Sequence, residues 1–122
     1  MSGRDPSLTL RQIIEFSDEI ATLVAGRARE ELDANREFRR ALERCIELVG
    51  EAATRLPVDW RERHNQIPWR EIIAMRNVMI HGYDVVLPEV LWNVATSDVP
   101  KLREAIHAIV EKATPTPRLK PM

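Results

Sequence analysis

The sequence contains little that would support a disulfide-linked, turn-rich or membrane-spanning protein. Its single cysteine, Cys45, cannot form an intramolecular disulfide, which favours a reduced, cytoplasmic setting. Only four glycines occur in 122 residues, too few for a β architecture that depends on tight turns. No apolar run approaches the roughly 20 residues that cross a bilayer, and the first residues lack the apolar core of a signal peptide. We therefore expect a cytoplasmic, globular protein built from helices.

Charge of one sign is also missing, because the formal net charge is only -1. Overall charge therefore does not indicate a nucleic-acid-binding protein, although a local basic patch can still attract phosphates over about 10 Å. Two local clusters of arginine occur. The first comprises Arg55, Arg61, Arg63, Arg70 and Arg76, and the second comprises Arg36, Arg39, Arg40 and Arg44. We interpret the second cluster as a solvated, salt-bridged helix face.

Apolar residues recur every three or four positions along most of the chain, and no segment alternates with a period of two. The pattern predicts an all-α fold, an antiparallel bundle of about five helices, in one domain over residues 1–113, followed by a flexible proline-rich tail over residues 114–122. The predicted helices begin at Pro6 after an Asp5 N-cap, near Asp33, at Pro68, at Pro88 and after an Asp98 N-cap, with Gly26, Pro57 and Gly82 as stop signals and one turn near Trp60.

Most candidate chemistry can be set aside. The three histidines, His64, His81 and His107, lie far apart and lack the spacing of zinc ligands, so we expect no metal site. There is no glycine-rich phosphate loop. Cys45 falls on an apolar stripe and is interpreted as a small core residue. His64 and His107 are interpreted as ordinary surface residues.

One segment, from Arg76 to Tyr83, combines groups that suit phosphodiester chemistry. Arginine is a permanent cation whose planar fork matches phosphate oxygens, and histidine is the side chain best suited to move protons near neutral pH. The end of a helix favours the protonated form of His81. The alternative is that Arg76 and His81 are only a capping pair at a helix C-terminus.

Helical geometry adds a constraint on this segment. Five residues separate Arg76 from His81, a rotation of about 140°, so the two side chains do not share a face of one regular helix. Asn77 and His81, four residues apart, do. For the side chains of Arg76 and His81 to converge on one site, either the helix must be distorted near Gly82 or a second protomer must supply part of the site. A two-fold interface would also supply two histidines, one as base and one as acid.

The ordered set of motifs resembles the HepT family of HEPN proteins. It comprises Ala41 to Arg44, Gly50 to Ala52, Ile67 to Trp69, the segment Arg76-Asn77 to His81-Gly82-Tyr83, Val90 to Trp92 and Asp98 to Leu102. The hallmark of that family is arginine, four residues, histidine, one residue and tyrosine, which falls here on Arg76, His81 and Tyr83. Asp84 departs from the family pattern, in which an apolar or aromatic residue is common.

The resemblance implies a helical homodimer whose two motifs meet in a cleft and cleave RNA. It also implies a type VII toxin–antitoxin pair. The partner would be an MntA-like minimal nucleotidyltransferase that uses ATP and Mg²⁺ itself and transfers AMP to Tyr83. We expect no cofactor for cleavage, and neither DNA nor a membrane as partner.

The predicted roles follow from residue chemistry within that framework. His81 acts as base or acid, Arg76 stabilises charge on the phosphoryl oxygens, and Asn77 orients His81 or the phosphate. Glu51 either faces the cleft and pairs with Arg76 or lies on the solvent side of its helix. Tyr83 is either the modification site or a phenol packed beneath the helix end. Two competing functions are a non-catalytic module that docks a nucleotidyltransferase and a small-molecule-binding bundle.

Overall fold

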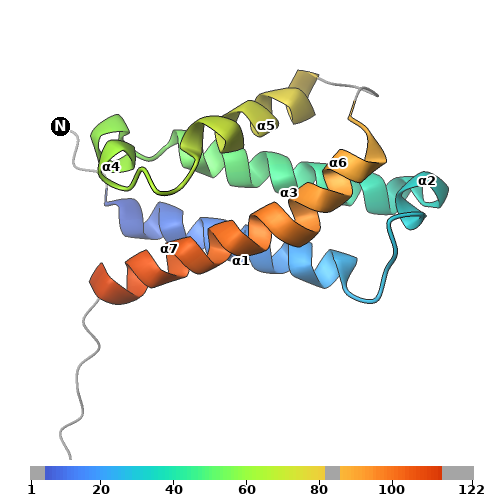
Figure 1. Ribbon diagram of the computed structural model, residues 1–122, viewed down its shortest axis with the longest axis horizontal. Coiled ribbons are helices and arrows are strands. Elements are labelled where there is room, and N and C mark those ends of the chain that lie inside the picture. The colour runs from blue at the N-terminus through green and yellow to red at the C-terminus, as the bar shows by residue number, and fades with distance from the viewer. Residues whose placement is uncertain (1–4, 82–85, 114–122) are drawn as a thin grey trace, which may run out of the picture.

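The computed structural model describes residues 5–81 and 86–113, with His81 and Ala113 described by their backbone alone. Every regular element in these two ranges is helical, which confirms the predicted all-α fold (Figure 1). The predicted tail lies outside the described residues. The elements are α1 (Pro6–Val24), α2 (Glu31–Ala34), α3 (Arg36–Thr54), α4 (Val58–Arg63), α5 (Trp69–His81), α6 (Pro88–Asn93), the π-helix η1 (Val94–Asp98) and α7 (Val99–Ala113).

Helix α1 begins and ends where the sequence predicts. The Asp5 carboxylate accepts a hydrogen bond from the Ser7 backbone N–H at 3.0 Å, and Pro6 is the first helical residue. Beyond the helix, Gly26 adopts φ +73°, a left-handed conformation that glycine takes without a steric penalty. Both ends of α1 are thus fixed by local chemistry.

The second predicted helix is divided in two. Asn35 lies in an extended conformation between α2 and α3, and its side-chain oxygen accepts a hydrogen bond from the Phe38 N–H at 3.0 Å. The helix expected from near Asp33 therefore begins at Arg36. The amide of Asn35 satisfies a backbone donor at the start of α3, which is the usual reason that asparagine is favoured at an N-cap.

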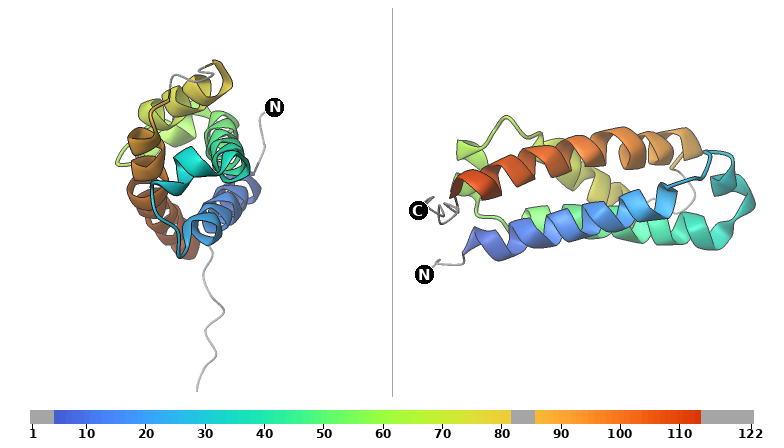
Figure 2. Two further views of the ribbon diagram at one scale, coloured as in Figure 1. Left: turned by 90° about the vertical axis from the view of Figure 1, so that its right-hand side faces the viewer. Right: turned by 90° about the horizontal axis from the view of Figure 1, so that it is seen from below.

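The prediction that Asp98 caps a new helix is wrong. Helices α6 and α7 form one continuous rod, joined by the π-helical turn η1, in which the Val99 N–H bonds to the Val94 carbonyl (Figure 2). Pro100 explains the turn, because a proline inside a regular helix lacks the N–H and its ring collides with the carbonyl four residues earlier. The wider π turn accommodates both effects without ending the rod.

The core lies between α1, α3 and the rod of α6, η1 and α7. Helix α1 packs on α3 and on α7, while α5 packs on the other side of α3 (Figures 1 and 2). Several core side chains are completely enclosed, among them Ile13, Ile20, Leu42, Leu91 and Ile106. In the described residues, no helix is both long enough and apolar enough to cross a membrane.

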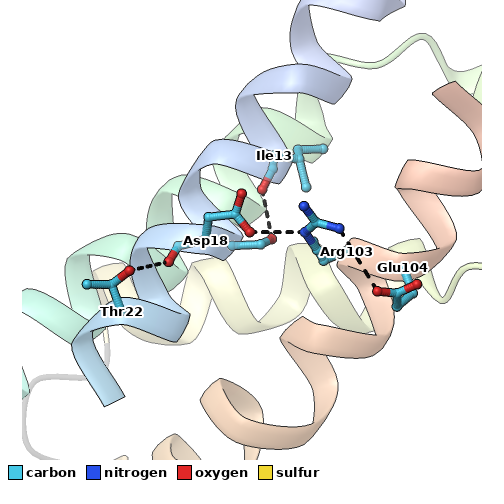
Figure 3. Close-up of polar contacts among 6 residues, drawn as sticks. Ile13, Asp18, Thr22, Arg103 and Glu104 are labelled. Atoms are coloured by element: carbon cyan, nitrogen blue, oxygen red, sulfur yellow. Dashed lines mark hydrogen bonds and ion pairs between the residues drawn. The ribbon is translucent and has the colours of Figure 1, made fainter. Parts of the chain in front are cut away.

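A polar contact links the first and last helices (Figure 3). Arg103 on α7 donates from its Nε to the Asp18 carboxylate on α1 at 3.0 Å. This hydrogen bond raises the pKa of Arg103 above the ordinary value of an arginine. On the same stretch of α1, the buried Ser17 hydroxyl donates to the Ile13 carbonyl at 2.7 Å. The ion pair between Asp18 and Arg103 therefore links α1 to α7 at the edge of the core.

Candidate functional site

Helix α5 carries the Arg76 to His81 segment, and aromatic packing holds its N-terminal end. The indole Nε1 of Trp69 donates to the His64 carbonyl at 3.0 Å. The His64 ring stacks on Trp60, with 4.0 Å between ring centroids, and its Nδ1 lies 2.9 Å from the Trp60 carbonyl. His64 is half-buried here, so its interpretation as an ordinary surface residue is wrong. Together these contacts fix where α5 starts and which way it runs.

Helix α5 approaches α3 closely at Gly50. A Cβ atom added to Gly50 would lie 2.2 Å from the Cβ of Arg76 and 3.1 Å from the Ile72 carbonyl oxygen. Only glycine fits at this point, and its absent side chain lets the backbone of α5 approach α3. Gly50 thereby places Arg76. Sequence reasoning missed this role, although a glycine inside a strongly periodic helix is a signal of close approach.

The guanidinium group of Arg76 is held by an amide instead of a carboxylate. Its Nη1 donates to the Asn77 side-chain oxygen at 2.9 Å. Its Nε is buried and has no hydrogen-bond partner among the described residues. A buried donor without a partner is costly, and no carboxylate of the described residues competes with an incoming anion for Arg76. The structure brings Arg76 and Asn77 together, but it joins Asn77 to Arg76, whereas we expected it to act on His81 or the phosphate.

Glu51 follows Gly50 on α3 and is half-buried. No ion pair joins its carboxylate to Arg76, although both residues belong to the described part of the chain. The first of the two expected positions, a pair with Arg76, is therefore not observed. Glu51 stays near the contact between α3 and α5 as a consequence of its place beside Gly50.

The backbone of α5 is α-helical from Trp69 to His81. Arg76 and His81 are therefore separated by about 140° around the helix axis, while Asn77 and His81 fall on one stripe. The His81 side chain, Gly82, Tyr83 and Asp84 lie outside the described residues, so their predicted roles stay predictions. Within α5 itself no distortion brings the arginine and histidine positions onto one face.

The chain that follows the motif is anchored to α3. Arg39 donates from Nη2 to the Val86 carbonyl at 2.5 Å and from Nε to the Glu43 carboxylate at 2.9 Å. Val86 is buried. These contacts fix the chain at Val86, where the described residues resume after α5. Arg39 and Arg44, which pairs with Glu47 at 3.0 Å, confirm a salt-bridged face for this part of the second cluster.

A groove of about 490 Å³ lies between α5 and the rod of η1 and α7. Its walls are apolar, and Glu71, Asp98 and Lys101 lie at its edge. The main apolar residues are Ile46, Val49, Ile72, Met75, Val99 and Leu102. In residues 5–80 and 86–113 no three His, Cys, Asp or Glu side chains are grouped as metal ligands.

The remaining polar candidates have ordinary structural surroundings. The Cys45 thiol lies 3.6 Å from a Glu19 carboxylate oxygen, to which it donates. Burial, followed by the nearby Glu19 charge, raises the pKa of Cys45 to about 11, so the thiolate nucleophile is scarce at neutral pH. The His107 side chain is 43% exposed and its Nε2 lies 3.7 Å from the Glu111 carboxylate, which agrees with its interpretation as a surface residue.

Comparison with known proteins decides the family. The model of the family described as ribonuclease HepT-like matches residues 13–109. The chain belongs to the HepT-like ribonuclease family. That membership confirms the predicted resemblance and, at the level of the family, the predicted endoribonuclease class.

Individual relatives extend over nearly the whole chain. A Methanocaldococcus jannaschii protein named as a candidate RNase, MJ1216, is 32% identical over 91% of this chain and 92% of its own length. A Thermococcus cleftensis protein named "Probable ribonuclease HepT" is 33% identical over 84% of this chain and 90% of its own. A Caldanaerobacter subterraneus protein, also named as a candidate RNase, is 30% identical over 89% and 97%. No solved structure matches the chain significantly.

Proposed function

We propose that this HepT-like chain is the cytoplasmic toxin of a type VII toxin–antitoxin system and cleaves RNA without a metal ion, at a site formed by two copies. One observation carries the proposal. Arg76 is fixed against Gly50, has a buried Nε without a described partner and is held by an amide, on the same helix that ends with His81. A cation with which no carboxylate of the described residues pairs suits a phosphate group.

The proposed reaction is internal transesterification. The 2′-oxygen of the RNA attacks the adjacent phosphorus while one His81 accepts the 2′-hydroxyl proton. The bond from phosphorus to the 5′-oxygen breaks, and the His81 of the second copy, in its protonated form, donates a proton to the leaving oxygen. Arg76 stabilises the negative charge that grows on the phosphoryl oxygens, and Asn77 orients the guanidinium group. The products are a 2′,3′-cyclic phosphate and a 5′-hydroxyl.

Two features support the participation of a second copy. The α-helical backbone from Trp69 to His81 separates the positions of Arg76 and His81 by about 140°, and the motif of one copy holds one histidine, whereas the reaction uses both a base and an acid. In addition, α5 protrudes beside an apolar groove whose edge carries Glu71 and Lys101, charges of opposite sign (Figure 2). A ridge next to a groove on one face, with both signs of charge, can be self-complementary about a two-fold axis.

Regulation is proposed to act on Tyr83. An MntA-like nucleotidyltransferase, with its own ATP and Mg²⁺, would attach AMP there. The adduct would add bulk and at least one negative charge two residues from His81, which would repel substrate phosphates and block the cleft.

Purified wild-type protein and two variants test the catalytic proposal. His81→Ala removes the proton-transfer group. Arg76→Met removes the charge but keeps an apolar stem to pack on Gly50. Both should lower cleavage of a labelled RNA by a factor of about 10² or more, with thermal unfolding close to that of the wild type. EDTA should leave wild-type cleavage unchanged. If either variant cleaves RNA at the wild-type rate, the assignment is wrong.

Intact-protein mass spectrometry tests the regulatory proposal. After co-expression with an active MntA-like nucleotidyltransferase, the chain should gain the mass of one or more AMP groups, and Tyr83→Phe should lose at least one of them. An unmodified chain in the presence of an active partner would contradict it.

The competing function is a non-catalytic module that docks a nucleotidyltransferase. The net charge of -1 and the apolar groove favour it over a small-molecule-binding role. The cleavage assay separates the two functions. A docking module would not cleave RNA, and it would bind its partner equally well with or without His81.

A further inference from the structure

Helices α3 and α5 form a surface opposite the groove, which we call the α3–α5 flank. The two helices run antiparallel (Figure 1) and touch at Gly50. From that contact line, helical geometry places the groove residues on one side. On the other side it places Arg36, Arg40, Glu47 and Glu51 of α3, with Arg70, Ile73 and Asn77 of α5. Asn77, the residue that holds Arg76, thus belongs to this flank.

Arg70 lies on the same stripe of α5 as Asn77. Seven residues separate them, which is about two turns, a displacement of about 10 Å with almost no rotation. Arg70 is exposed and has neither an ion pair nor a side-chain hydrogen bond within the described residues. Because both residues belong to one unbroken helix, the position of Arg70 relative to Arg76 is fixed by the backbone.

Most other arginines of the described ranges are engaged. Arg36 and Arg40 on α3 resemble Arg70, since both are exposed and no described residue pairs with their side chains. Of the two, Arg40 is the nearer to Gly50. It lies ten residues before Gly50, about 15 Å along α3, whereas Arg70 lies about 9 Å from Arg76 in the opposite direction. The engaged arginines are Arg27, Arg29, Arg39, Arg44, Arg63 and Arg103 in ion pairs, and Arg55 and Arg61 in hydrogen bonds.

The carboxylates on the flank do not cancel these two charges. Glu47 is mostly buried and pairs with Arg44 at 3.0 Å. Glu51 is half-buried next to the helix contact. The exposed groups at the two ends of the flank are guanidinium groups, and Arg76 lies between them.

We propose that Arg70 and Arg40 bind phosphates of the RNA strand on the two sides of the phosphate that Arg76 contacts. This inference rests on the proposed ribonuclease function. It adds a binding track of about 24 Å that lies mostly outside the Arg76 to Tyr83 segment. Phosphate contacts position an RNA without reading its sequence, so the track sets affinity and register, while the motif carries the chemistry.

Cleavage kinetics and RNA binding test the track with matched variants. We compare Arg70→Ala and Arg40→Ala with Arg11→Ala, an exposed arginine on α1 that has no ion pair with a described residue, and with Arg70→Lys. Each track variant should raise KM for a single-stranded RNA about threefold or more at 0.15 M salt, with kcat nearly unchanged. Arg11→Ala should match the wild type, and Arg70→Lys should recover most of the affinity.

Salt dependence gives a readout that a purely structural effect does not move. Binding of labelled RNA is measured in a His81→Ala background, so that the strand stays intact. The slope of log K against log salt should become shallower by about 0.7 for each phosphate contact that is lost. Unchanged slopes for both Arg70→Ala and Arg40→Ala would overturn the track while leaving wild-type cleavage intact. Absence of any RNA binding or cleavage by the wild type would overturn the proposed function as well.

Discussion

Arg76 combines a buried stem with a charged end that no described carboxylate neutralises. The sequence predicts the importance of Arg76 and Asn77 from their residue types near a helix end. It does not predict their mutual hydrogen bond, because adjacent helical residues point in different directions and only the side-chain rotamers bring them to 2.9 Å. The sequence leaves two positions open for Glu51, and the pair with Arg76 is not observed among the described residues, since Glu51 lies about 100° around α3 from Gly50, the residue that Arg76 contacts.

Cys45 gives a prediction at this scale. Its pKa is raised to about 11 by burial and by Glu19, so its thiolate fraction at pH 7 to 8 is about a hundredfold below that of an ordinary thiol. Alkylation of the folded protein by iodoacetamide should be slow and should accelerate with pH up to about 11. Glu19→Gln should increase the rate, while Glu15→Gln serves as the control. Rapid modification of the native protein at neutral pH would contradict this assignment.

At the scale of the elements, residue patterns located the helices well and their junctions less well. Asp5, Gly26 and Pro88 mark helix ends as expected, because caps and stops depend on local chemistry. Asp98 misled, because it resembles an N-cap although the rod of α6 and α7 passes through it. A proline inside a helix permits either a break or a π turn, and only packing against the core decides between them.

The contact between α3 and α5 depends on Gly50. Gly50→Ala adds a Cβ atom 2.2 Å from the Arg76 Cβ, so the helices must separate. We expect a loss of about 1–3 kcal/mol in the free energy of unfolding and a larger fall in kcat, because Arg76 moves with α5. Chemical denaturation and cleavage assays measure the two effects.

Gly26→Ala is the matched control for that experiment. Gly26 has φ +73° and open space around its Cβ position, so alanine there costs about 1–2 kcal/mol through backbone strain alone. Similar destabilisation with normal kcat is expected. If Gly50→Ala also retained normal kcat, the contact would not position Arg76.

For the whole molecule, the all-α class and the family could be predicted from the sequence, because helical periodicity and the ordered motifs both extend over most of the chain. The groove between α5 and α7 could not, since it depends on how far α5 lies from the rod, which no local pattern records. That groove and the unbroken α5 are the features that point to a second copy. The dimer itself stays a proposal.

A mixed dimer measures the central claim most directly. Differently tagged wild-type and His81→Ala chains are co-expressed, the dimer with both tags is purified, and its cleavage rate is compared with that of the wild-type dimer. If one phosphate needs a histidine from each copy, a single substituted copy should remove nearly all activity. A mixed dimer with half the wild-type rate, or a fully active chain that is monomeric in solution, would contradict the account.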